Sequence, residues 1–307
     1  MTSETPIKSG KNTPAIAVEH LSKQFHLGFT RRLVTAVVNA HFTVKKGCAF
    51  GLVGPNGAGK TTTIKALMGL IKPTSGSLYI DGVAVPNVKS RQRLGYLPEN
   101  PHFYDHLKAE EYLVFAGMLC GMGKKETLVK AEELLEFVGL EMAKNKAIRK
   151  FSKGMVQRLG LAQTLIHDPE IVVLDEPQSG LDPIGRKEVK DMILSLKAKG
   201  RTVFFSSHIL HDVEDVCDEI AVLINGRVRE VGHVETLLRP EILQNEIEIS
   251  GVSQAFLENF QKKALRCQHQ TDTTLFFFSG DQDSSKIAQE VISAGGLVHR
   301  LIPHRER

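Results

Sequence analysis

The chain has 307 residues, enough for one large domain or two of ordinary size. Its 39 basic and 35 acidic side chains leave a formal net charge of +4, so we expect no nucleic acid as a partner. The four cysteines are far apart, which argues against a zinc site or a disulfide framework and fits a reducing cytosol, and no apolar run approaches the roughly 20 residues that span a bilayer.

The first 14 residues are polar and lack the apolar stretch of a secretory signal, so we expect a flexible tail at 1–14. Two strands are predicted next, at Ala15–Leu21 and Ala36–Val44, because both are rich in apolar and β-branched residues. The loop between them carries Phe25.

A phosphate-binding motif follows the short apolar run Ala49–Val53 and precedes the helical stretch Thr63–Met68. It fits the pattern G-x-x-x-x-G-K-[ST], with residues Gly54, Pro55, Asn56, Gly57, Ala58, Gly59, Lys60, Thr61 and Thr62. Strand, glycine-rich turn and helix are the context in which this pattern curls backbone N–H groups around phosphate oxygens. A glycine turn without a ligand is the alternative.

Two side chains of this motif have chemistry that suits a nucleotide. Lys60 would reach the β- and γ-phosphates as a point charge, and the Thr61 hydroxyl would hold the Mg²⁺ that bridges them.

The next part of the chain changes character. Gly76–Ile80 and Val83–Val85 form a predicted hairpin around Asp81-Gly82, a strong turn signal. From about residue 88 to residue 166 we predict a mostly helical insert, since Lys108–Cys120 and Lys125–Val138 have helical periodicity.

Strands then alternate with helices. The apolar runs Ile171–Leu174, Thr202–Phe205 and Ile220–Ile224 predict strands, and Gly185–Lys199 predicts an amphipathic helix that ends at Gly200. This alternation indicates a parallel α/β core, in which ligands bind at the carboxyl ends of the strands.

The carboxyl ends of two of these strands carry polar residues that suit phosphoryl hydrolysis. Asp175 would orient the Mg²⁺ shell, Glu176 would accept a proton from the attacking water or orient it, and His208 would hydrogen-bond the γ-phosphate. The alternatives are an acidic pair that caps the next element and a structural histidine.

A helix start at Ser152 lies within a basic segment. No carboxylate occurs from Lys144 to Arg158, and Ser152 is a predicted N-cap. The start of this helix could bind an anion, or the segment could be a solvated basic surface.

The last part of the chain predicts a small β-α-β-α-β module. Its strands are predicted at 246–249, 274–278 and 297–301, its helices at 256–263 and 284–294, and Glu241–Asn245 is the predicted linker.

Together these motifs resemble the nucleotide-binding subunit of an ATP-binding-cassette (ABC) transporter. The family's elements occur in order from Ala15 to Gly232. They are an adenine-stacking aromatic at Phe25, Walker A at Gly54–Thr62, Glu99 where the family has Gln, a signature at 151–155, Walker B at Asp175 and Glu176, a dimer-contact loop at 179–182 and the switch His208.

The resemblance implies a P-loop NTPase cassette of the α/β class. It has a RecA-like core, an antiparallel β subdomain and a helical subdomain at about 88–166. The cassette would occupy residues 15–240, and 241–307 would form a small α+β accessory domain.

The resemblance also implies the cofactors, the site residues and the partners. ATP and Mg²⁺ would bind at Walker A, with Thr61, Glu99 and Asp175 around the metal. Two cassettes would dock head to tail, so that Ser152 and Gly154 face a γ-phosphate bound to the other copy.

ATP would close this dimer and hydrolysis would reopen it. Integral membrane subunits would receive that motion at the cytoplasmic face of the cell membrane. Residues 99–107 would line the groove for their coupling helix. Phe103 and Tyr104 fit such a partner-facing patch, although packing inside the helical insert is the alternative.

Several residues depart from the common family pattern. They are Glu99, Phe151, Lys153, Met155 and Gln178. Glu99 together with Gly154-Met155 resembles the single-cassette subunits of bacterial second-type ABC exporters, so an exporter is expected. The alternatives are a soluble ABC ATPase that acts on a nucleic-acid or protein complex, and a module that holds ATP without turnover.

Overall fold

A computed structural model describes residues 13–27, 32–238, 242–270 and 272–305. The chain divides into two compact units, Met1–Thr236 and Leu237–Arg307, and each is described by itself. Most of the tail predicted at 1–14 and the first residue of the predicted linker, Glu241, lie outside the described residues.

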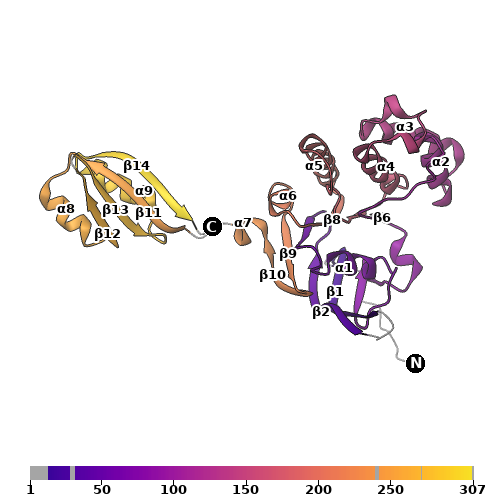
Figure 1. The fold of residues 1–307 in the computed structure, drawn as a ribbon, viewed down its shortest axis with the longest axis horizontal. Coiled ribbons are helices and arrows are strands. Elements are labelled where there is room, and N and C mark those ends of the chain that lie inside the picture. The colour runs from indigo at the N-terminus through magenta and orange to yellow at the C-terminus, as the bar shows by residue number, and fades with distance from the viewer. Residues whose placement is uncertain (1–12, 28–31, 239–241, 271, 306–307) are drawn as a thin grey trace. The chain divides into compact units, whose positions relative to one another are not determined.

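A six-stranded sheet forms the centre of the first unit (Figure 1). Its strands are parallel except for the edge strand β10, as expected for an α/β core. In spatial order they are β10 (Arg227–His233), β9 (Glu219–Ile224), β3 (Ala49–Val53), β8 (Thr202–Ser207), β7 (Ile171–Leu174) and β6 (Leu94–Leu97). Strands β3, β7 and β8 are buried along their whole length because helices and a second sheet cover them.

Along the chain, the helices of this unit lie between the strands of the central sheet, except for the last, which follows the edge strand β10. They are α1 (Lys60–Leu67), α2 (Ala109–Leu119), α3 (Lys124–Phe137), α4 (Lys153–Leu165), α5 (Pro183–Ala198), α6 (Leu210–Glu214) and α7 (Val234–Leu237), whose last residue belongs to the second unit. Three short 3-10 turns lie at η1 (Val88–Arg91), η2 (Glu141–Ala143) and η3 (Ile148–Lys150).

An antiparallel sheet packs against the central sheet. Its order is β2 (Arg32–Val44), β1 (Ile16–Leu27), β4 (Ser75–Ile80) and β5 (Val83–Ala84). Phe42 of this sheet stacks on Phe50 and Phe204 of the central sheet, with ring centroids 5.5 and 6.0 Å away. Such apolar contacts hold the P-loop strand β3 in place.

The β1–β2 hairpin is longer than its sequence predicts. Phe25 lies in β1 and not in a loop, because Phe25 pairs with Val34 of β2. The register shifts between Val18 and Gln24 interrupt the alternation of apolar residues, which is why the sequence pattern ended the strand at Leu21.

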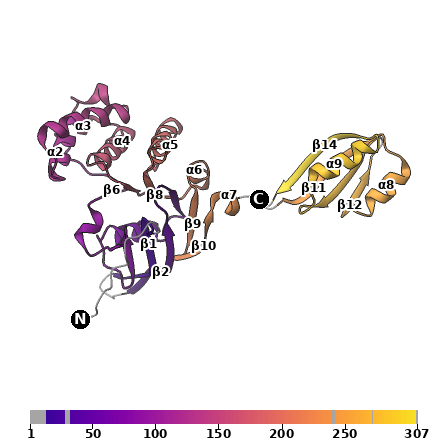
Figure 2. The ribbon, with the colours of Figure 1, turned by 180° about the vertical axis from the view of Figure 1, so that it is seen from behind.

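The helical part of the first unit consists of α2, α3 and α4, and it is shorter than the insert predicted at 88–166. Helices α2, α3 and α4 lie together in both ribbon views (Figure 1, Figure 2). Strand β6, however, lies within that range and pairs with β7 at the edge of the central sheet. A four-residue edge strand gives too short a pattern to be recognised without its partner.

The second unit is a four-stranded antiparallel sheet with two helices on one face. The spatial order is β12 (Arg266–His269), β13 (Thr274–Ser279), β11 (Ile242–Ser250) and β14 (Leu297–Arg305). Helices α8 (Gln254–Gln261) and α9 (Ser284–Ser293) give the split β-α-β-β-α-β arrangement. The core includes Ile247, Phe260 and Phe276. Strand β12 was not predicted, since its residues are mostly polar.

Among the described residues, no helix is both long and apolar enough to cross a membrane.

Candidate functional site

The P-loop is held so closely that two of its glycines have no room for a side chain. A Cβ on Gly54 would lie 2.1 Å from the carbonyl oxygen of Leu223, and a Cβ on Gly59 would lie 2.4 Å from that of Ala36. Gly59 is also the N-cap of α1, with φ at 106°. These backbone contacts fix the turn between β3 and α1.

The middle of the loop faces open space. Gly57 has φ at +80°, and a Cβ there would meet nothing within 4 Å. The loop and the first turn of α1 line a hollow of about 310 Å³, together with Ala36, Glu99 and Glu176. Because the N-terminus of α1 carries a partial positive charge and free N–H groups, this hollow suits a phosphate chain.

Lys60 is buried at the base of this hollow. Its Nζ donates to the carbonyl oxygen of Gly54 at 2.6 Å and lies 3.1 Å from Oε1 of Glu176. The ammonium group is therefore placed between the loop backbone and the end of β7.

Asp175 lies beside the first turn of α1. Its Oδ1 accepts hydrogen bonds from Ser206 Oγ at 2.7 Å and Thr61 Oγ1 at 3.1 Å. Its Oδ2 is buried and has no hydrogen-bond partner in the described part of the chain. Burial raises the pKa of Asp175 against the effect of the Ser206 and Thr61 hydrogen bonds, and the charges of Glu99 and Glu176 raise it further.

Glu176 follows in a strained backbone conformation, with φ at +48°. Its N–H donates to Ser206 Oγ at 2.9 Å, and its Oε2 lies 2.7 Å from Nδ1 of His208. Ser206 thus contacts both acidic residues and was not singled out from the sequence. Its position at the end of β8, two residues before His208, was the available signal.

The structure brings most of the predicted site residues together. Residues 56, 57 and 59–62 line the hollow together with Glu99 and Glu176. Asp175 accepts a hydrogen bond from Thr61, and His208 contacts Glu176. Phe25 does not line it, and its ring lies 4.8 Å from Lys23 Nζ.

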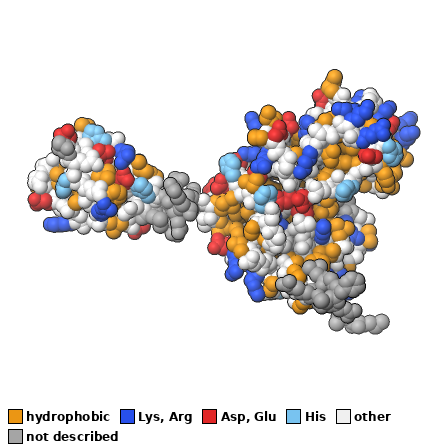
Figure 3. Space-filling view, viewed as in Figure 1, with side chains coloured by type: hydrophobic (Ala, Val, Ile, Leu, Met, Phe, Trp, Pro, Cys, Tyr) orange, Lys and Arg blue, Asp and Glu red, His pale blue; other side chains and the backbone are white. Residues whose placement is uncertain are grey.

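Ser152 and Gly154 lie elsewhere in the same unit, in a second hollow of about 390 Å³. Ser152 caps α4, since its Oγ accepts the N–H of Met155 at 3.3 Å. Lys and Arg side chains gather over the helices α2–α4 in the space-filling view (Figure 3). The two hollows are thus separate, each with its own helix N-terminus.

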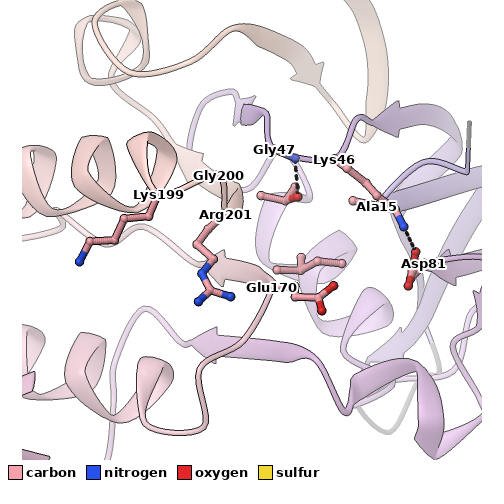
Figure 4. Close-up of a pocket in the computed structure, with 10 residues that line it drawn as sticks. Ala15, Lys46, Gly47, Asp81, Glu170, Lys199, Gly200 and Arg201 are labelled. Atoms are coloured by element: carbon pink, nitrogen blue, oxygen red, sulfur yellow. Dashed lines mark hydrogen bonds and ion pairs between the residues drawn. The ribbon is translucent and has the colours of Figure 1, made fainter. Parts of the chain in front are cut away.

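A further hollow, of about 260 Å³, lies at the amino ends of the central strands (Figure 4). Most of its charged side chains are paired: Lys46 with Asp81, Arg201 with Asp168, and Glu170 with Arg93. Lys199 lies over the Phe137 ring, with Nζ 5.1 Å from the ring centroid. Gly47 N–H donates to Thr202 Oγ1 at 2.9 Å. The residues that line this hollow include no helix N-terminus, whereas the P-loop leads into the start of α1.

Comparison with known proteins agrees with this geometry. The family model described as ABC transporter matches residues 37–179. An uncharacterized ABC transporter ATP-binding protein of Synechocystis is 45% identical over 245 residues, which cover 78% of this chain and 69% of the relative. The Nod factor export ATP-binding protein I of Ralstonia nicotianae is 33% identical over 272 residues, 88% of this chain and 83% of the relative.

A solved structure of an ATP-binding subunit of an ABC transporter is also similar. It is 33% identical in sequence, has a TM-score of 0.64, and the match covers 73% of this chain and 92% of that one. The predicted cassette fold is thereby confirmed. By sequence, fold and the arrangement of its P-loop, this chain belongs to the ATP-binding proteins of the ABC transporters and is an ATPase of that family.

Proposed function

We propose that the chain is the Mg²⁺-dependent motor subunit of an ABC exporter, and that it works as a homodimer at the cytoplasmic face of the membrane. One observation carries the proposal: Lys60, Thr61 and Glu176 line one hollow, and both ends of the acidic pair are tied to it. Asp175 accepts a hydrogen bond from Thr61, and Glu176 contacts Lys60 and His208. The direction of transport is supported by the relative whose name describes Nod factor export.

The P-loop binds the phosphates of ATP in this proposal. Its N–H groups and the start of α1 surround the β-phosphate, and Lys60 reaches the γ-phosphate. Phe25 stacks on adenine from the β1–β2 hairpin.

Residues that follow β6 and β7, together with one in the first turn of α1, fit a divalent cation. The buried Oδ2 of Asp175 has no hydrogen-bond partner among the described residues, and the Thr61 hydroxyl lies beside Oδ1. Thr61, Asp175 and Glu99 would hold Mg²⁺, since hydroxyl and carboxylate oxygens are the ligands it prefers. When bound, Mg²⁺ neutralises charge on the phosphate oxygens.

Glu176 prepares the attacking water. Its carboxylate orients the water or accepts its proton, and His208 fixes Oε2 of that carboxylate while contacting the γ-phosphate. The Glu176 backbone, held through Ser206, keeps this carboxylate aligned.

The second hollow completes the site of another copy. Ser152 and Gly154 lie at the start of α4 and line this hollow together with Lys153. We propose that this surface closes over the γ-phosphate of the partner cassette, so that ATP joins the two copies and hydrolysis separates them.

An apolar patch on the helical part is proposed to meet the membrane subunit. Tyr104 is 56% exposed and Phe115 is 39% exposed, and their rings lie 5.7 Å apart. Phe103 packs instead edge-on against Tyr112, at 4.9 Å. Tyr104 thus fits the partner-facing patch, and Phe103 fits packing within the helical part.

The test combines turnover with assembly. We expect Lys60→Ala and Glu176→Gln to lose at least ~100-fold in ATP hydrolysis, and Glu176→Gln with ATP to elute as a dimer on size exclusion. Lys65→Ala, an exposed lysine on the same helix, is the control. Steady hydrolysis in Glu176→Gln would remove its assigned role, and an unchanged elution position would contradict the dimer.

The membrane partner is tested by affinity purification of the tagged chain from detergent-solubilised membranes. We expect a polytopic protein in the eluate, and its loss when Tyr104 and Phe115 are both changed to Ser, with ATP hydrolysis by the isolated chain unchanged. Recovery of soluble partners alone would favour a soluble ABC ATPase.

A further inference from the structure

The signature segment contains a lysine whose side chain lies on the dimer-contact loop. Lys153 is the first residue of α4, and its Nζ occupies the space in which a side chain at position 180 would begin. A Cβ on Gly180 would lie 2.0 Å from Nζ and 2.9 Å from Cε of Lys153. Glycine suits position 180 for two reasons: its backbone φ is +68°, which favours glycine, and it leaves room for the lysine side chain.

Lys153 and Gly180 are both exposed, and the end of the Lys153 side chain lies against Gly180 without an ion pair. The other charges of this hollow have their own partners: Arg158 lies 3.5 Å from Glu188, and Asp182 Oδ1 accepts the N–H of Gly185 at 2.9 Å. Lys153 makes no ion pair with a described residue. The end of its stem covers the bare Cα of Gly180 instead.

Leu181 also lies beside the start of α4. A Cβ on Gly154 would lie 3.8 Å from Cδ2 of Leu181, a side chain that is almost fully buried, and both residues line the same hollow. The start of α4 thus lies beside two consecutive residues of the loop.

The loop at 176–182 is short, and hydrogen bonds connect it to Glu176. Ser179 N–H donates to the Glu176 carbonyl at 3.0 Å, and Leu181 N–H donates to the Gln178 carbonyl at 3.3 Å. The Gln178 side chain donates to the Arg186 carbonyl at 3.2 Å. With so few rotatable bonds between them, a shift at Gly180 moves the backbone of Glu176, which is already strained.

We propose that Lys153 is a positioning residue that ties the start of α4 to the 176–182 loop and so keeps Glu176 aligned. This inference rests on the proposed function and deepens it. Because the start of α4 closes over the partner's nucleotide while Glu176 serves the chain's own, the contact between Lys153 and Gly180 links the two ATP sites of the dimer.

The first measurement is steady-state hydrolysis by the full chain. Lys153→Ala is expected to lower kcat by about fivefold with little change in KM for ATP, because the P-loop is untouched. Lys153→Arg, which keeps the stem and the charge, is expected to stay close to wild type. Lys146→Ala, an exposed lysine of the same basic segment, is the control for the lost charge.

The decisive measurement is a double-mutant cycle on kcat. Gly180→Ala must displace the Lys153 side chain, so both single variants break the same contact, and Lys153→Ala/Gly180→Ala is expected to be no slower than Gly180→Ala. Effects that multiply in the double variant would overturn the proposal. An equal fall of kcat in Lys146→Ala would do the same.

These outcomes are separable from the proposed function. If Glu176→Gln still forms an ATP-dependent dimer while the cycle shows independent effects, the inference about Lys153 fails and the motor function stands. If neither the dimer nor dependence of hydrolysis on Glu176 is found, the proposed function fails first. Thermal unfolding of each variant shows that all are compared as folded proteins.

Discussion

The ammonium group of Lys60 lies 3.1 Å from a carboxylate oxygen of Glu176, and their side chains are only 5% and 9% exposed. A buried pair of this kind compensates two charges that would each be costly alone. In the proposed site, Glu176 therefore competes with phosphate for Lys60. The residue to which we assign hydrolysis would then oppose the binding of its substrate.

Removing this competitor should strengthen ATP binding. We expect Glu176→Gln to bind ATP about tenfold more tightly than wild type, because Lys60 then pairs only with phosphate and loop carbonyls. Equilibrium binding of a fluorescent ATP analogue at protein concentrations below dimerisation measures it. Glu170→Gln, an acidic residue at the other end of the sheet, should leave the affinity unchanged, and weaker binding by Glu176→Gln would contradict the competition.

The buried carboxylate of Asp175, which we propose as a Mg²⁺ ligand, should lower the stability of the folded chain when no metal is bound. Burial raises its pKa in the folded chain, so the folded state disfavours its charged form. The free energy of unfolding is therefore higher below this pKa and falls as pH rises through it. Asp175→Asn is therefore expected to raise the unfolding temperature near neutral pH in the absence of Mg²⁺, while abolishing hydrolysis.

Thermal unfolding against pH checks this prediction. The gain in Asp175→Asn should disappear on acidification, when the wild-type carboxyl becomes protonated. Asp191→Asn, an exposed aspartate of α5, should show no such difference. A lower unfolding temperature for Asp175→Asn at neutral pH would mean that the hydrogen bonds to Ser206 and Thr61 outweigh desolvation.

Phe25 should matter for the base and not for the phosphates. We expect Phe25→Ala to weaken ATP binding by about tenfold, a loss within the roughly 1–3 kcal/mol range for stacking of a base on an aromatic ring. Phe25→Tyr should bind as wild type does. Calorimetric titration with ATP and with inorganic triphosphate distinguishes the roles, because triphosphate has no base. Equal losses for the two ligands would instead indicate a distorted β1–β2 hairpin.

The second unit contains a mostly buried carboxylate that should support its stability. Glu246 lies 2.5 Å from Arg300 Nη2 and 2.6 Å from His304 Nε2, and its side chain is 10% exposed. Its partners are half exposed, so we expect Glu246→Gln to cost about 1–2 kcal/mol, less than a fully buried pair. Calorimetry of the full chain should show a lower unfolding temperature for the second unit. Glu258→Gln, on α8, is the control.

Much of the cassette was predictable because its signals are local. The pattern of consecutive residues at 49–68 predicts a strand, a turn and a helix. Asp175-Glu176 directly follows an apolar strand. Parallel strands bring their carboxyl ends to one edge, so the meeting of these motifs followed from the fold class. The second unit was less predictable, since a polar edge strand such as β12 has no apolar pattern of its own.

By itself, then, the sequence determined the fold class, the P-loop and the acidic pair, because a strand, a turn and a helix start each depend on neighbouring residues. Only the tertiary structure decided that β6 joins the central sheet, that Ser206 contacts both Asp175 and Glu176, and that Lys153 lies on Gly180. These relationships join residues far apart in the chain. They arise from strand pairing and close packing, which no local pattern encodes.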